Sequence, residues 1–248
     1  MRGFSPEDIQ RLEINGIYIE PTSQAGPVLV FPISDGEGGE IRILWQSGIY
    51  ESATYTDSRR DQLVFSYLQF YDMMFDLCKN VKRVAMLGGG GCSYPRYLIA
   101  SHPEVFCDVV EVDESIAQIA KKWFFVDDAM AASNGRLSLQ IEDGVTYIEE
   151  TAQGKRQKYD AVLNDCFLGS KFPQKMTTTA WMQSVAESLN VGGVYLVNVV
   201  ASQTGELSDK LTSIVQSAQK VFSSVRVIPT DEETDQNEAD NLMMVCQK

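Results

Sequence analysis

Short apolar runs alternate with amphipathic stretches along the chain from residue 81 onward. The apolar runs cover residues 84–87, a stretch ending at 111, and residues 136–144, 159–165, 194–200, 224–229 and 241–247. The stretches between them carry apolar residues at helical spacing, as in residues 114–124, 145–153, 176–190 and 207–222. This alternation predicts an α/β fold, a Rossmann-like, mostly parallel sheet with helices on both faces. The last two runs, separated by a short loop, predict an antiparallel C-terminal hairpin.

The pattern before residue 81 is different. Residues 14–20, 28–33 and 41–50 are short, rich in Ile, Val, Tyr and Trp, and separated by Pro and Gly. This pattern predicts a small β-meander or hairpin. A helix-start signal at residues 56–58 then precedes apolar residues at helical spacing, including Tyr67, which predicts one helix up to about residue 80. We therefore expect a small N-terminal β-strand segment at 1–55 and a Rossmann-like domain at 56–248.

A run of glycines follows the first apolar run of the larger part. It consists of Gly88, Gly89, Gly90 and Gly91, and the next apolar run ends on Glu111. Glycines in such a turn permit positive φ and the close approach of a ligand, and an acid at the tip of the second strand can accept hydrogen bonds from ribose hydroxyls. The order of strand, glycine turn, helix, strand and acid predicts a nucleoside-binding site. The alternative is an ordinary glycine turn of an α/β protein.

Polar side chains also follow the later apolar runs. Asp143 and Gly144 end the third, and Asn164 and Asp165 end the fourth. Because the carboxyl ends of parallel strands share one edge of a sheet, these residues are expected to share a crevice with the glycine turn. For Asp143, as for Asp113, the alternative is a carboxylate that caps a neighbouring helix.

Composition narrows the classes of partner and ligand. The 248 residues carry a net charge of −13, which argues against nucleic acid or an anionic membrane as a partner and is compatible with a cationic substrate such as a polyamine. The five cysteines are scattered and the chain has one histidine, so neither a zinc site nor another metal site nor a disulfide framework is indicated. No signal-peptide pattern or membrane-spanning apolar run is visible, and we expect a cytoplasmic protein.

Together the motifs resemble those of a known family. They are LGGGGCS (87–93), SHPEV (101–105), VVEVDESI (109–116), IEDGVTYI (141–148) and YDAVLNDCFLG (159–169). As a set they resemble the spermidine synthase family of aminopropyltransferases, which share the class I methyltransferase fold. The resemblance covers about residues 40–200. It implies an S-adenosyl cofactor, either S-adenosylmethionine or its decarboxylated form, a small-molecule acceptor and a homodimer.

The resemblance also implies roles for individual residues. Glu111, with the adjacent Val112, would bind the ribose hydroxyls of the cofactor, and Asp143 with Gly144 would read the adenine amino edge. The glycine turn would pass beside the sulfonium and its tail. Asp165 matches the first aspartate of the family's TDSSDP loop and, with Tyr67 on the preceding helix, would be catalytic.

Two positions depart from the family pattern. The second aspartate of TDSSDP is Leu168 here, and the aspartate of the family's GGGD turn, which helps hold the charged cofactor tail, is Gly91. Leucine accepts no proton from an attacking amine. We therefore expect methyl transfer to an unknown small molecule, a reaction in which alignment of the acceptor supplies much of the catalysis. The alternatives are a polyamine aminopropyltransferase in which Asp165 or Glu142 substitutes for the lost acid, and a non-catalytic nucleoside-binding or oligomerisation protein.

Overall fold

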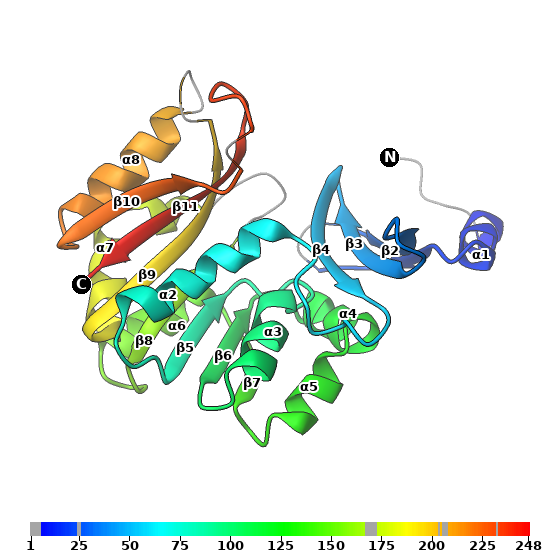
Figure 1. The fold of residues 1–248 in the computed structure, drawn as a ribbon, viewed down its shortest axis with the longest axis horizontal. Coiled ribbons are helices and arrows are strands. Elements are labelled where there is room, and N and C mark those ends of the chain that lie inside the picture. The colour runs from blue at the N-terminus through cyan, green and yellow to red at the C-terminus, as the bar shows by residue number, and fades with distance from the viewer. Residues whose placement is uncertain (1–5, 24–25, 167–172, 203, 205–207, 232) are drawn as a thin grey trace.

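The computed structural model describes residues 6–23, 26–166, 173–202, 204, 208–231 and 233–248. The chain forms two sheets, which Figure 1 shows as a small N-terminal sheet beside a large sheet with helices on both faces. The α/β architecture, the mostly parallel large sheet and the N-terminal β segment are confirmed. Leu168 lies outside the described residues.

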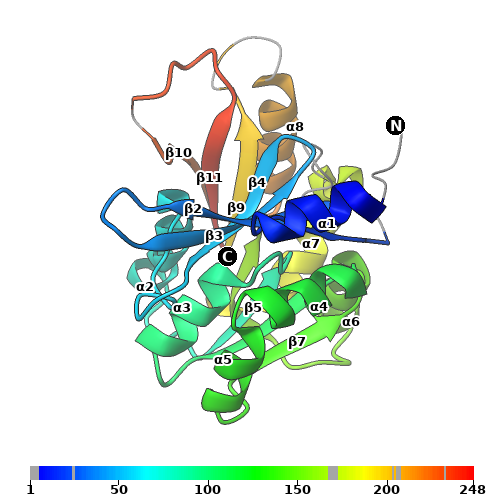
Figure 2. The same cartoon turned by 90° about the vertical axis from the view of Figure 1, so that its right-hand side faces the viewer.

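The N-terminal sheet is a four-stranded antiparallel meander in the order β1-β2-β3-β4. Its elements are α1 (Pro6–Ile14), β1 (Tyr18–Glu20), β2 (Val28–Ser34), β3 (Glu40–Gln46) and β4 (Ile49–Tyr55). The single strand predicted over 41–50 is wrong, because Ser47 and Gly48 both have positive φ and form a tight turn between β3 and β4. The helix α1, which the sequence analysis did not predict, lies at the outer end of this sheet (Figures 1 and 2).

The large sheet has seven strands in the order β10-β11-β9-β8-β5-β6-β7. They are β5 (Arg83–Leu87), β6 (Phe106–Glu111), β7 (Leu137–Ile141), β8 (Tyr159–Asn164), β9 (Leu189–Ala201), β10 (Ser224–Pro229) and β11 (Asp240–Gln247). The pairings from β7 to β9 are parallel, whereas β11 runs antiparallel to both β9 and β10. The expected antiparallel C-terminal hairpin is therefore confirmed.

Helices cover the two faces of the large sheet and enclose two separate cores. One face packs against η1 (Ser66–Asp72), α2 (Met73–Leu77), α3 (Ser93–Ser101), α4 (Glu114–Trp123) and α5 (Val126–Ala132). The other packs against α6 (Gly144–Ala152), η2 (Gln174–Thr177), α7 (Thr179–Ser188) and α8 (Ser208–Gln219). Both faces of the strands are thus buried, as the near-continuous apolar runs in the sequence require.

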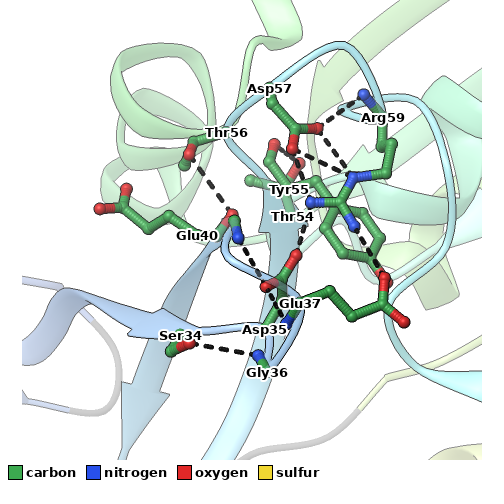
Figure 3. Close-up of polar contacts among 11 residues, drawn as sticks. Ser34, Asp35, Gly36, Glu37, Glu40, Thr54, Tyr55, Thr56, Asp57 and Arg59 are labelled. Carbon is green, nitrogen blue, oxygen red and sulfur yellow. Dashed lines mark hydrogen bonds and ion pairs between the residues drawn. The ribbon is translucent and has the colours of Figure 1, made fainter.

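The single long helix predicted after residue 56 is wrong. Residues before Ser66 form turns, and only the short helices η1 and α2 follow. The Asp57 carboxylate accepts bonds from the backbone N–H and the guanidinium of Arg59, while the same guanidinium reaches Asp35 in the β2–β3 turn at 2.5 Å (Figure 3). Arg59 holds the pKa of Asp35 at about 2. Such side-chain bonds to the nearby backbone compete with a helix and tie this segment to the N-terminal sheet.

Gly192 and Gly193 lie within strand β9 and not at the end of the preceding helix. Helix α7 ends at Ser188 and strand β9 begins at the next residue. Gly192 has a φ of +76° and lies where the register between β8 and β9 shifts, after the pair Tyr159 and Leu189. The stretch of β9 between the pairs Tyr159–Leu189 and Ala161–Val194 is longer than that of β8, and glycine accommodates the positive φ in it.

Candidate active site

A cavity of about 740 Å³ lies at the carboxyl ends of β5, β6 and β8, with β4 of the N-terminal sheet on its other side. Strand β5 pairs with β6 on one side and with β8 on the other, so the chain order reverses here. The sequence-predicted site residues that line the cavity are Tyr67, Gly88, Gly89, Gly90, Glu111, Val112, Asp143, Gly144 and Asp165. Gly91 is not among the described residues that line it.

Gly88 has a position that requires glycine. Its φ is +87°, and a Cβ there would lie 2.5 Å from the carbonyl oxygen of Asp165. Its N–H donates to the Val110 carbonyl at 3.0 Å. The absence of a side chain at Gly88 thus lets the ends of β5, β6 and β8 meet at the cavity floor.

Gly91 lies behind the turn, against the N-terminal sheet. A Cβ at this position would lie 2.6 Å from the hydroxyl oxygen of Ser52 and 2.8 Å from a ring carbon of Phe124. Ser52 in turn contacts the Ser93 hydroxyl at 3.1 Å, at the start of α3. Strand β4 therefore occupies the space that a side chain at position 91 would need.

The Glu111 side chain holds the glycine turn in place through hydrogen bonds to its backbone. Its carboxylate accepts hydrogen bonds from the backbone N–H groups of Gly89 at 2.9 Å, Gly90 at 3.3 Å and Asp113 at 2.9 Å. The side chain is only 8 % exposed. Because a carboxylate has about four acceptor sites, one remains for a ligand hydroxyl.

Both acids for which helix capping was the alternative do cap helices. Asp113 accepts from the Ser115 N–H at 2.9 Å at the start of α4, and also receives the Ser23 hydroxyl at 2.9 Å from the N-terminal segment. Asp143 accepts from the Thr146 N–H at 2.9 Å at the start of α6. Asp143 nevertheless lines the cavity as well, so capping does not remove it from the site.

Asp165 is held by donors from two distant parts of the chain. The Tyr67 hydroxyl donates to one carboxylate oxygen at 3.0 Å, and the Asn198 amide donates to the other at 2.9 Å. Burial raises the pKa of Asp165, and the bonds from Asn198 and Tyr67 oppose that rise. The structure thus joins Asp165 to Tyr67, and adds Asn198, which sequence reasoning missed because it lies inside an apolar strand run.

Asn164 fixes the backbone next to Asp165. This buried side chain accepts from the Cys166 N–H at 3.0 Å and donates to the Tyr195 hydroxyl at 2.8 Å. The Tyr71 hydroxyl donates to the Asn164 carbonyl at 3.0 Å. Satisfied buried networks of this kind rigidify the segment that carries them, so Asp165 sits on a fixed support.

Glu51 is a cavity residue that sequence reasoning missed entirely. It lies on β4, and its Oε1 atom is shut off from solvent and has no hydrogen-bond partner among the described residues. Burial raises its pKa to about 7, with further contributions from the charges of Asp165 and Glu111. Nothing in residues 1–55 marks this glutamate, because its place beside the glycine turn arises only when the two sheets pack together.

Glu142 does not supply a substitute for the acid lost at position 168. Its carboxylate pairs with the Arg156 guanidinium at 2.9 Å, and it is not among the described residues lining the cavity. Arg156 also pairs with Glu150 at 2.8 Å, which holds the guanidinium on α6. This part of the sequence hypothesis is therefore wrong, and Asp165 is the remaining candidate of the two.

The cavity is strongly acidic. Its described lining carries one cationic side chain, Lys175, and six carboxylates, from Glu51, Glu111, Asp113, Asp143, Asp165 and Asp240. Such a lining favours a positively charged ligand. Across the described residues no cluster of three His, Cys, Asp or Glu side chains could hold a metal ion, and no helix is long and apolar enough to span a membrane.

Replacement of Glu51 by glutamine is expected to stabilise the protein above pH 7. A carboxyl whose pKa is about 7 when folded and 4.5 in its ordinary state opposes folding once the pH exceeds 4.5, and the penalty is complete above 7. At about 1.36 kcal/mol per pKa unit, the gain at pH 8 is at most about 3 kcal/mol. Thermal unfolding at pH 8 and pH 5 tests this, since the gain should fall below about 1 kcal/mol at the lower pH. An equal effect at both pH values would contradict the assignment.

The sheet order, the antiparallel β11 and the cavity at the switch point together define an α/β protein of the class I methyltransferase fold. Solved structures agree. The chain superposes on a probable spermidine synthase from Corynebacterium glutamicum with a TM-score of 0.75, at 21% identity, over 92% of this chain and 80% of that one. It superposes on human Methyltransferase-like protein 13 in complex with SAH with a TM-score of 0.56, at 24% identity, over 73% and 78% of the two chains.

A family model for the spermine/spermidine synthase domain matches residues 70–232. The chain therefore belongs to the spermine/spermidine synthase domain family.

Curated relatives carry the same assignment. The chain is 27% identical to the polyamine aminopropyltransferase of Vibrio vulnificus over 71% of its length and 56% of that protein. It is 27% identical to the spermidine synthase of Solanum lycopersicum over 76% of its length and 51% of that protein. The chain thus spans about half the length of the curated relatives it matches. The expectation of methyl transfer to a small molecule is wrong, because the family and these relatives are aminopropyltransferases.

Proposed function

We propose that this protein is a polyamine aminopropyltransferase that uses decarboxylated S-adenosylmethionine. The observation that carries the proposal is the acidic cavity at the switch point, where Asp165 is held between Tyr67 and Asn198. Both substrates of this reaction are cations, and the cavity lining favours cations. Membership in the family supports the same assignment.

The nucleoside half of the cofactor occupies the side of the cavity formed by β5, β6 and α6. Glu111 accepts a ribose hydroxyl through its remaining acceptor site, and Val112 packs beside it. Asp143 and Gly144 face the adenine edge. The glycine turn allows the sulfonium to approach the backbone closely, because no Cβ intervenes.

The transfer itself is a displacement at carbon. The amine nitrogen of the acceptor attacks the methylene carbon bonded to sulfur, a carbon–nitrogen bond forms, and the carbon–sulfur bond breaks. The electron pair of the broken carbon–sulfur bond stays on sulfur, and neutral methylthioadenosine leaves. The new ammonium then loses a proton, which Asp165 accepts.

Asp165 suits this role because of its surroundings. Burial raises its pKa, which makes it a better proton acceptor than a solvated aspartate. Tyr67 and Asn198 fix the two carboxylate oxygens, so the acceptor amine is oriented before the displacement begins. Because position 168 holds no acid, we assign the proton acceptor to Asp165, the cavity carboxylate that Tyr67 and Asn198 orient.

The test is a turnover assay with purified protein. Incubation with decarboxylated S-adenosylmethionine and a panel of aliphatic diamines and triamines is expected to release methylthioadenosine and an aminopropylated amine in equal amounts, measured by mass spectrometry. S-adenosylmethionine in place of the decarboxylated cofactor is the control and should give no product. Binding of methylthioadenosine without turnover of any amine would favour the non-catalytic alternative and overturn the proposal.

A further inference from the structure

The Glu51 carboxylate has one buried oxygen that receives no hydrogen bond from the described residues. Its Oε1 atom is inaccessible to solvent, has no hydrogen-bond partner among the described residues, and belongs to a side chain that lines the cavity. An acceptor buried without a donor is unfavourable, more so when it is charged. A ligand that brings a donor with a positive charge would remove this penalty.

The position of Glu51 relative to the glycine turn indicates which part of a ligand it meets. A Cβ on Gly90 would lie 3.7 Å from the Glu51 carbonyl oxygen, so β4 packs directly on the turn. The next residue, Ser52, fills the space that a side chain at Gly91 would need. Strand β4 thus excludes an acid from the turn and presents one of its own beside it.

The groups that face Glu51 do not neutralise it. Its pKa is raised by burial and by the negative charges of Asp165, just after β8, and of Glu111 on β6, and Tyr67 on η1 adds a neutral phenol. Glu51 therefore lies near both the ribose acid and the acceptor acid and lines the same cavity. In a ligand whose ribose meets Glu111 and whose reactive carbon meets Asp165, the aminopropyl chain continues beyond that carbon and ends in an ammonium group, for which the Glu51 carboxylate is a nearby acceptor.

We propose that Glu51 binds the ammonium group of the aminopropyl chain on the cofactor and thereby selects decarboxylated S-adenosylmethionine over the intact form. This inference rests on the proposed function. The decarboxylated cofactor brings a lone ammonium to the Glu51 carboxylate. The intact cofactor brings a carboxylate next to that ammonium, into a region that already holds Glu51, Asp165 and Glu111, and like charges repel there.

Three ligands separate the contribution of the aminopropyl chain to the binding affinity from that of the nucleoside. Methylthioadenosine lacks the aminopropyl chain, decarboxylated S-adenosylmethionine has it, and S-adenosylmethionine has it with the extra carboxylate. Calorimetric titration of the wild type and Glu51→Gln with each should show about 10- to 100-fold weaker binding of the decarboxylated cofactor to the variant, the scale of a lost bond to a charged group. Binding of methylthioadenosine should stay within about twofold, since an exchange of equal size leaves its contacts intact.

The matched control is Glu142→Gln, which makes the same chemical change in an acid that is paired with Arg156 outside the cavity. It should leave all three affinities within about twofold, as expected for a partly exposed ion pair. Thermal unfolding of each variant verifies that it is folded. Equal weakening of both cofactors and methylthioadenosine in Glu51→Gln would overturn the inference, because the residue would then act on the nucleoside or on the fold.

The pH dependence gives an independent readout. Wild-type affinity for the decarboxylated cofactor should rise with pH through about 7, because the ionised Glu51 binds a cation better than the protonated form does. Asp165 and Glu111 remain in Glu51→Gln, so any dependence that they cause persists in the variant, and only the part due to Glu51 is lost. Identical profiles for the two proteins would overturn the inference.

The two proposals fail in different ways. Turnover by the wild type with no change in cofactor selectivity in Glu51→Gln would leave the aminopropyltransferase proposal in place and remove the role of Glu51. Preferential wild-type binding of S-adenosylmethionine, or no binding of any of the three ligands, would overturn both.

Discussion

Replacement of Asp165 by asparagine is expected to lower kcat for aminopropyl transfer about 1000-fold, within the range that proton acceptors contribute to catalysis. The amide keeps the size of the side chain, and one of its atoms can still accept a bond from Tyr67 or Asn198. It can neither take a proton nor attract the acceptor ammonium. Steady-state release of methylthioadenosine measures kcat, and titration with methylthioadenosine should show nearly unchanged nucleoside affinity.

The variant Tyr67→Phe should show a smaller loss of turnover than Asp165→Asn and serves as the comparison for that experiment. It removes one donor to Asp165 and leaves the carboxylate and the Asn198 bond in place, so a smaller loss of about tenfold is expected. The assignment of Asp165 would be wrong if Asp165→Asn retained more activity than Tyr67→Phe. It would also be wrong if the asparagine variant lost nucleoside binding as strongly as turnover, because Asp165 would then serve the cofactor site.

Glu111→Ala is expected to have the second largest effect, on both binding and stability. The substitution removes the ribose acceptor, which weakens methylthioadenosine binding by about 1 to 3 kcal/mol. It also leaves the N–H groups of Gly89, Gly90 and Asp113 without their buried partner. Only the Asp113 bond is fully buried, since Gly89 and Gly90 line the cavity, where water can replace the carboxylate. An unpaired buried donor costs about 1 to 3 kcal/mol, so we expect a loss of stability of that size. Calorimetry and denaturant unfolding measure the two effects.

Asp143→Asn is the control for Glu111→Ala. Asparagine is as good a helix N-cap as aspartate, so the stability of the protein should change little in this variant. The substitution still removes the carboxylate that faces the adenine edge. Nucleoside affinity that survives Glu111→Ala unchanged would discard the ribose assignment. Unchanged stability in that variant would show instead that the turn does not depend on the carboxylate.

Much of the large sheet was predictable because its information is local. Buried parallel strands are near-continuous apolar runs, and the helices between them repeat their apolar residues every three to four positions. The strand ending at Glu111 and the strand ending at Asn164 follow from such runs. The common edge of these strands then follows from the rule that parallel strands share their carboxyl ends.

Local patterns failed where a distant contact decided the conformation. The helix predicted from residue 56 is replaced by turns because Arg59 bonds both Asp57 beside it and Asp35 in the N-terminal sheet. The strand predicted over 41–50 failed for a local reason instead, because the turn at Ser47 and Gly48 divides it. In neither case does apolar periodicity contain the deciding interaction.

The expectation of methyl transfer is corrected by the family and the relatives, not by a contact in the structure. The sequence records that Gly91 and Leu168 replace two acids, and from that loss alone methyl transfer was the expectation. The structure places Glu51 of β4 beside the glycine turn and lets Ser52 fill the space at Gly91.

The sequence by itself determined the Rossmann-like sheet, the order of its strands along the chain, and the glycine turn followed by Glu111. These depend on periodicity and short spacings, which a single chain segment contains. Only the tertiary structure decided that Tyr67 and Asn198 meet at Asp165 and that Glu51 joins the cavity. Those contacts arise when β4, η1 and β9 pack around the ends of β5 and β8, and the position of a side chain in such packing has no local pattern.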